Sequence, residues 1–144
     1  MSVPPDVLSR MPHRGPMLFL DEVLEVGAST ARTRTVLRED FLLAKDGKVS
    51  PLVSIELFAQ AAAAFMASKT APSDRPTVQG ALLGSRSLDT FVDTFEVGDE
   101  LIAEVEQVFG AGALAQFKCV LYRGETKVAE GNINVVSGTD VVRG

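Results

Sequence analysis

The longest apolar stretch of the chain runs from Pro51 to Thr70 and would be hydrophobic on nearly every side of a helix. Within residues 52–67 only Ser54, Glu56 and Gln60 are polar. A helix without a wet face is typical of one that is buried all round. The stretch is shorter than the roughly 20 apolar residues that a membrane span needs, and it contains an acid. The pattern therefore predicts a core helix and no membrane span.

In the rest of the chain, shorter segments alternate apolar and polar residues, as β-strands do. Before the helix, residues 17–26 and 31–37 are expected to form two strands around a turn at Gly27 and Ser29, followed by a loop with a turn at Asp46-Gly47. After the helix, Gly-containing turns separate four further predicted strands, at residues 78–88, 101–109, 113–122 and 127–136.

This order of elements predicts an α+β fold. A helix that is apolar on all sides must be covered, and a curled antiparallel sheet wrapped around it is the economical solution for a short chain, the hot-dog fold. At 144 residues the chain is expected to form a single domain over residues 1–144. One sheet does not cover the whole helix and leaves open edges, so at least a dimer is expected.

Composition and charge exclude several classes of function. The net charge is −5 and the basic residues are scattered, which argues against nucleic-acid binding. One Cys and one His leave no zinc cluster, and no glycine-rich phosphate loop occurs, so neither a metal nor a cofactor is expected. Cys119 lies in an apolar run and is expected to be a buried, inert thiol. Residues 1–10 lack a signal-peptide pattern, which predicts a cytoplasmic protein.

Two polar residues of the apolar helix share one face. Glu56 and Gln60 are four residues apart, which places one above the other. A carboxylate in an apolar helix is costly unless it is paired, hydrogen-bonded or protonated, and burial would raise its pKa, as suits a general acid. The alternative is that the first helical turn reaches solvent, where a Glu favours the helix dipole.

Three motifs in the chain are similar to those of one enzyme family. Residues 11–21 read Met-Pro-His-Arg-Gly-Pro-Met-Leu-Phe-Leu-Asp, residues 55–61 read Ile-Glu-Leu-Phe-Ala-Gln-Ala, and residues 91–101 read Phe-Val-Asp-Thr-Phe-Glu-Val-Gly-Asp-Glu-Leu. They resemble the opening Leu-Pro-His-Arg-x-Pro motif, the active-site helix Ile-Glu-x-x-Ala-Gln-Ala and the segment Phe-x-x-x-Val-x-x-Gly-Asp-x-Leu of the β-hydroxyacyl-acyl-carrier-protein dehydratases. The resemblance extends over most of the chain and also implies the hot-dog fold.

The resemblance implies an activity and a partner. These enzymes remove water from a 3-hydroxyacyl thioester, carried on the phosphopantetheine of an acyl carrier protein. A His takes the α-proton, an acid on the helix of the neighbouring subunit protonates the leaving hydroxyl, and a backbone N–H at the helix start binds the thioester oxygen. Glu56 matches the acid. The acyl chain is expected to run along the helix past Ala59 and Ala63.

Two parts of the family's machinery have no counterpart at the matching positions. The family's His stands fourteen residues before the acid, where this chain has Leu42, and His13 is the only histidine present. The family's oxyanion-binding Gly stands five residues before the acid, where Pro51 has no N–H to offer. Two arrangements follow. Glu56 completes the active site of a more complete dehydratase-like partner, or His13 acts opposite Glu56 within this chain.

Four further side chains are weighed as site residues. His13 lies in a rigid corner rich in proline and is either catalytic or a structural hydrogen-bonding residue. Arg14 and Arg86 are candidates for substrate binding. Arg14 would anchor the phosphopantetheine or an acidic residue of the carrier protein, with a surface ion pair as the alternative. Arg86 would line the same channel, with solvent exposure as the alternative. Gln60, the third candidate for substrate binding, is expected to orient Glu56 or to form a hydrogen bond across a subunit interface.

With these departures from the family pattern, the chain resembles one branch in particular, the divergent dehydratases of aryl polyene pigment pathways. That branch has a Pro-His-Arg-x-Pro-Met-Leu corner, an Ile-Glu-x-x-Ala-Gln helix, a Leu-Leu-Gly-x-Arg strand and an Asn-Val strand end, matched here by residues 12–18, 55–60, 82–86 and 134–135. The likeness implies a polyunsaturated substrate on an acyl carrier protein, and a homodimer or a heterodimer with another dehydratase-like subunit. The alternatives are a non-catalytic hot-dog subunit that stabilises a partner or holds an acyl chain, and a thioesterase on the same fold.

Overall fold

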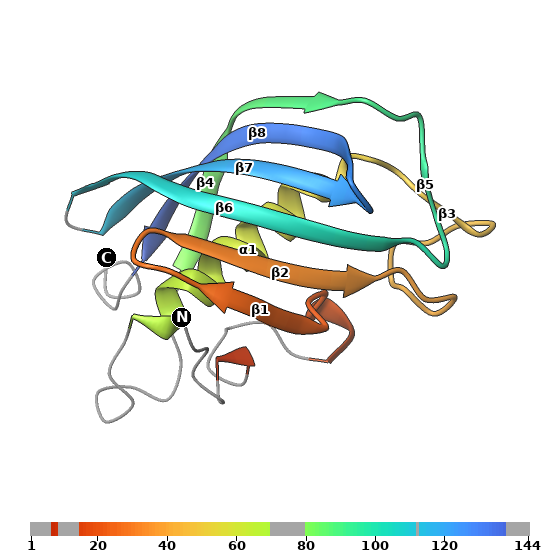
Figure 1. Cartoon of the computed structure of the whole chain (residues 1–144), viewed down its shortest axis with the longest axis horizontal. Helices are drawn as coiled ribbons and strands as arrows, with labels where there is room; N and C mark the ends of the chain where they lie inside the picture. Colours follow the sequence, from red (N-terminus) through yellow and green to blue (C-terminus); the bar gives the residue numbers. More distant parts are fainter. Residues whose placement is uncertain (1–6, 9–14, 70–79, 112, 138–144) are drawn as a thin grey trace.

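A six-stranded antiparallel sheet curls around one long helix in the computed structural model, which describes residues 7–8, 15–69, 80–111 and 113–137 (Figure 1). The helix is α1 (Val53–Ser68), and a 3-10 turn, η2 (Gly15–Met17), precedes the first strand. The sheet order is β1 (Glu22–Val26), β2 (Thr30–Val36), β6 (Glu100–Ala111), β7 (Leu114–Arg123), β8 (Thr126–Ser137) and β4 (Gly80–Thr90). Two short strands, β3 (Lys48–Val49) and β5 (Phe95–Glu96), pair in a separate small sheet. The predicted α+β hot-dog architecture is confirmed.

Helix α1 is the core helix that its pattern predicts. Its small residues pack directly against the sheet, and the Phe65 ring meets Phe117 of β7 edge to face, with ring centroids 5.7 Å apart. Ile55, Glu56 and Ala59 are only partly buried, however. They lie on one side of the first turns of the helix, so the described chain covers α1 on all sides except this one.

Strand β2 shows why the sheet has one dry and one wet face. Ala31, Thr33 and Thr35 are buried against the helix, whereas Arg32 and Arg34 alternate with them on the solvent side. The predicted alternation is confirmed. The same period of two holds along β6, where residues 101, 103 and 105 face the core.

The first strand is shorter than predicted. Residues 17–26 were expected to be extended, but β1 begins only at Glu22. The Leu18 amide closes the 3-10 turn on the Gly15 carbonyl oxygen at 3.0 Å, and the Phe19 amide donates to the Gln60 side chain of α1 at 2.8 Å. Because these amides are already bonded, the apolar residues before β1 pack against the helix as a loop.

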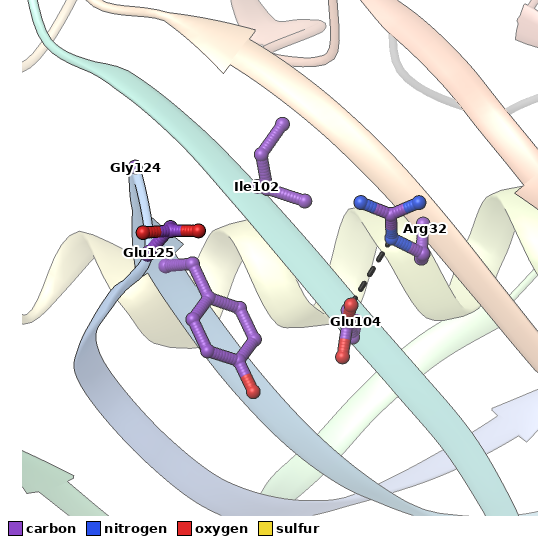
Figure 2. A pocket seen from close by; sticks show the side chains of 6 residues that line it. Arg32, Ile102, Glu104, Gly124 and Glu125 are labelled. Atoms are coloured by element: carbon purple, nitrogen blue, oxygen red, sulfur yellow. Dashed lines mark ion pairs between the residues drawn. The ribbon is translucent and has the colours of Figure 1, made fainter.

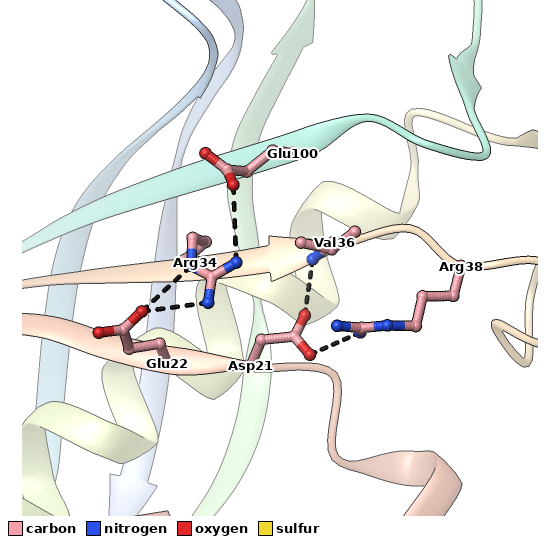
Figure 3. Close-up of polar contacts among 6 residues, drawn as sticks. All are labelled: Asp21, Glu22, Arg34, Val36, Arg38 and Glu100. Carbon is pink, nitrogen blue, oxygen red and sulfur yellow. Dashed lines mark hydrogen bonds and ion pairs between the residues drawn. The ribbon is translucent and has the colours of Figure 1, made fainter.

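A charged cluster fastens the start of β1 to the end of β2 (Figure 3). One oxygen of Asp21 accepts a hydrogen bond from the Val36 amide and the other from the Arg38 guanidinium, both at 2.6 Å. Figure 3 also shows Arg34 of β2 paired with one carboxylate on each neighbouring strand. Asp21, which belongs to the opening motif, therefore has a structural role in this fold.

Among the described residues, β1 and β4 are the two edge strands of the sheet. The pairing of β4 with β8 is irregular, since its register skips Leu83 and Arg86. The two backbones are also very close at Gly131, where an added Cβ atom would lie 2.3 Å from the Ser87 carbonyl oxygen. No helix among the described residues is long and apolar enough to cross a membrane.

Candidate active site

A single buried side chain connects the helix to the segment that precedes β1. Gln60 is 0% exposed; its Oε1 accepts from the Phe19 amide at 2.8 Å, and its Nε2 donates to the Met17 carbonyl oxygen at 2.8 Å and to Glu56 Oε2 at 3.0 Å. The Phe19 amide is a pure donor and the Met17 carbonyl a pure acceptor, which fixes the orientation of the Gln60 amide. Gln60 thus orients Glu56, one of its two predicted roles, and its role in substrate binding stays a prediction.

Glu56 lies in the first turn of α1 and faces a depression of about 410 Å³. Apolar side chains form most of its walls, and two of them, Leu43 and Leu52, are 50% and 69% exposed at the surface. The described lining residues are Leu43, Val49, Ser50, Leu52, Val53, Ile55 and Glu56. A carboxyl group beside an apolar hollow of this size can meet a substrate bound there, as a general acid must.

The backbone amides at the start of α1 are all engaged. The amides of residues 53–55 donate to the carbonyl oxygens of residues 50–52, at 3.1, 3.0 and 3.2 Å. The Leu52 amide donates to Ser50 Oγ at 3.2 Å, and Pro51 has no amide hydrogen. The first helical turn therefore has no unpaired backbone donor for a substrate oxygen. The family's backbone oxyanion donor is thus missing at Pro51 and also at the amides that follow it.

Ser50 is a residue of this depression that the motifs do not predict. Its hydroxyl oxygen accepts a hydrogen bond from the Leu52 amide, and Ser50 lines the same depression as Glu56. The signal in the sequence is a hydroxyl residue just before a long helix, followed by proline, which is a common helix start. That signal alone indicates a structural role, and only the fold shows that Ser50 lines the depression beside Glu56.

The structure does not test the other predicted site residues. His13 and Arg14 lie outside the described residues, and Arg86 is described only by its backbone in β4. Leu42, at the position of the family's His, is 52% exposed. The described residues include no histidine and no group of three or more residues able to hold a metal ion. Ala59 and Ala63 do not line the depression beside Glu56, so the path of the acyl chain stays a prediction.

A second depression, of about 210 Å³, lies on the opposite face of the sheet (Figure 2). Figure 2 shows α1 behind the strands that carry it, so this hollow is separated from Glu56 by the sheet. Two of its charged residues, Arg32 and Glu104, are paired with each other at 3.0 Å, and both side chains are more than 40% exposed. This hollow therefore has no connection to the site around Glu56.

Comparison with solved structures supports the fold. The chain is similar to the dehydratase heterocomplex ApeI:P from Xenorhabdus doucetiae, with a TM-score of 0.87 and 21% identity over 99% of this chain and 97% of that chain. It is also similar to Cj0977, a sigma28-regulated virulence protein from Campylobacter jejuni, with a TM-score of 0.59 and 20% identity over 83% and 77% of the two chains. A hypothetical thioesterase with coenzyme A from Streptococcus pneumoniae TIGR4 gives a TM-score of 0.62 and 14% identity over 81% and 84%. Identities this low establish the shared fold alone.

Comparison with protein families gives the identity. No protein with a curated description matches the chain significantly. The model of the ApeP-like family, described as ApeP dehydratase, matches residues 5–143, which is nearly the whole chain. The chain therefore belongs to the ApeP-like family and is a dehydratase with the hot-dog fold, of the aryl polyene type that its motifs resemble.

Proposed function

We propose that this dehydratase removes water from 3-hydroxyacyl thioesters carried on the phosphopantetheine of a cytoplasmic acyl carrier protein, in aryl polyene biosynthesis. The general acid is Glu56. The observation that carries the proposal is the position of this carboxyl group, held by Gln60 beside an apolar depression of about 410 Å³. The family match favours this reaction over the hydrolysis of a thioester by the same fold.

The reaction divides into two proton transfers. A base takes the proton from the α-carbon, the bond between the β-carbon and its hydroxyl breaks, and a double bond forms between the two carbons. Glu56 gives its proton to the leaving hydroxyl, which departs as water. Because Gln60 holds Oε2 of Glu56 as an acceptor at 3.0 Å, the carboxyl group is already oriented before the substrate binds.

The base is proposed to come from a second, dehydratase-like subunit. Three observations support this arrangement: the similar solved structure is a heterocomplex of dehydratases, Leu42 stands where the family has its histidine, and the partly exposed side of α1 carries Glu56. The edge strands β1 and β4 give such a subunit a place to pair. His13 of this chain is the second candidate for the base.

Replacing Glu56 by glutamine tests the acid role. Glu56→Gln keeps the size of the side chain but removes its transferable proton, so the dehydration rate should fall on the order of a hundredfold or more. The measurement is conversion of a 3-hydroxyacyl carrier-protein thioester by the chain alone and together with its co-encoded dehydratase. The matched control is Glu104→Gln on the outer face of the sheet, which should leave the rate unchanged. A silent Glu56→Gln in every combination would show a non-catalytic subunit.

The same assay separates the two candidate bases. His13→Asn should abolish turnover if the base belongs to this chain. If a partner subunit supplies the base, His13→Asn should leave the activity of the combined subunits intact, and a single histidine substitution in the partner should abolish it.

A further inference from the structure

The depression beside Glu56 has one hydroxyl group in its described wall, that of Ser50. We propose that Ser50 is a further catalytic residue, whose hydroxyl donates a hydrogen bond to the thioester carbonyl oxygen of the substrate. This inference rests on the proposed function and adds a residue that the family's motifs do not include.

The chemistry of the elimination requires such a donor. As the α-proton leaves, negative charge builds on the thioester carbonyl oxygen, and a hydrogen-bond donor placed there lowers the barrier most in an apolar surrounding. The backbone cannot supply it at the start of α1, since the amides of residues 52–55 are bonded within the chain and Pro51 has none. Of the side chains that form the described wall, only Ser50 and Glu56 are polar, and Glu56 is assigned to the leaving hydroxyl.

Ser50 is held in place for this task. Its backbone carbonyl accepts the Val53 amide at 3.1 Å, and its Oγ accepts the Leu52 amide at 3.2 Å, so both ends of the residue are fixed to the first helical turn. A hydroxyl group that accepts one hydrogen bond still has its own proton to donate. No described residue accepts that proton, and Ser50 is exposed at the depression, so a bound thioester can reach it.

The position of Ser50 adds a second favourable contribution. An oxyanion bound by Ser50 lies at the N-terminal end of the 16-residue helix α1, where the aligned peptide dipoles produce a partial positive charge. Donor and dipole act on the same oxygen, and both are in place before the substrate arrives. The arrangement stabilises developing negative charge without a backbone N–H.

Three variants separate the two functions of the Ser50 hydroxyl, which are to donate its proton to the substrate and to accept the Leu52 amide. Ser50→Ala removes both functions and should lower kcat on the order of a hundredfold, with KM little changed. Ser50→Asp still accepts the Leu52 amide but has no proton to donate, so it should keep the thermal stability and lose kcat to the same extent. Ser50→Thr keeps acceptor and donor and should stay within about tenfold of the parent rate. If Ser50→Asp restored activity, or Ser50→Ala kept it, the inference would be wrong.

The assay is the one used for Glu56→Gln, with the chain in complex with its co-encoded dehydratase. Ser29→Ala, at an exposed turn, is the matched control and should not change kcat. Loss of activity in Glu56→Gln together with full activity in Ser50→Ala would leave the proposed function standing and overturn only the role of Ser50. A silent Glu56→Gln would overturn the proposed function itself.

Discussion

Gln60 joins two parts of the protein through one amide group. Its hydrogen bonds to Glu56, Met17 and Phe19 link the helix to the segment before β1, across 41 residues of sequence in the case of Phe19. The spacing of four residues within α1 was enough to predict the contact with Glu56. The contact with Phe19 was not predictable, because nothing in a local pattern indicates which distant amide a buried side chain will bond.

Replacing Gln60 by leucine should cost both stability and activity. Gln60→Leu keeps the volume of the side chain but leaves the buried partners without their hydrogen bonds, so the free energy of unfolding should fall by about 2–4 kcal/mol. Urea unfolding measures this loss, and the dehydration rate should fall as Glu56 loses its orientation. Gln116→Leu, on the outer face of β7, is the control and should change stability by less than about 0.5 kcal/mol. Equal effects of the two substitutions would contradict the role of Gln60.

At the scale of elements, the hydrophobic period predicts which residues are buried, whereas hydrogen-bond partners decide whether an apolar segment forms a strand or a loop. The period of two along β2 identified its buried face correctly, and the long apolar run identified α1, which begins and ends within two residues of its predicted bounds, 51–70. The apolar residues before β1 can be buried equally well in a strand or in a loop that packs on the helix. Their hydrogen-bond partners, the Gly15 carbonyl and Gln60, favour the loop, and these partners cannot be read from the pattern.

The close contact between β8 and β4 gives a prediction at this scale. In Gly131→Ala the new methyl group would lie 2.3 Å from the Ser87 carbonyl oxygen, so the two strands must separate locally. We expect a loss of about 1–3 kcal/mol in the free energy of unfolding and faster hydrogen exchange of the β4 amides. Thr126→Ala, at the exposed start of β8, should change neither quantity. Unchanged exchange in Gly131→Ala would show that the strands do not fit as closely as described.

For the whole molecule, the sequence predicted a closed core, which the structure confirms, and a site that lacks the family's histidine, which stays a prediction. Cys119 is 0% exposed on β7, and burial raises the pKa of its thiol well above the ordinary range, as expected of an inert core cysteine. The base of the reaction is not identified by the structure, since His13 lies outside the described residues and the other candidate belongs to a partner. A partner's contribution cannot be predicted from one chain, since no pattern within it records the side chains of another.

Cys119 provides a measure of global unfolding. A raised pKa leaves little reactive thiolate, and the core shields the sulfur, so a thiol reagent should label the native protein only as fast as the whole domain opens. Labelling should rise with urea along the same curve as the loss of circular dichroism. A Ser29→Cys variant should gain one thiol that reacts at once while Cys119 stays protected. Immediate labelling of both would contradict a closed core.

The irregular register of β4 has a consequence for the fate of the free chain. Fibrils grow when identical strands stack edge on edge with an unbroken ladder of evenly spaced N–H and C=O groups. Because the register of β4 skips Leu83 and Arg86, this edge presents an interrupted ladder that a straight strand cannot continue. The register shifts that hinder the stacking of identical strands would still allow β4 to pair with a partner strand that has matching irregularities.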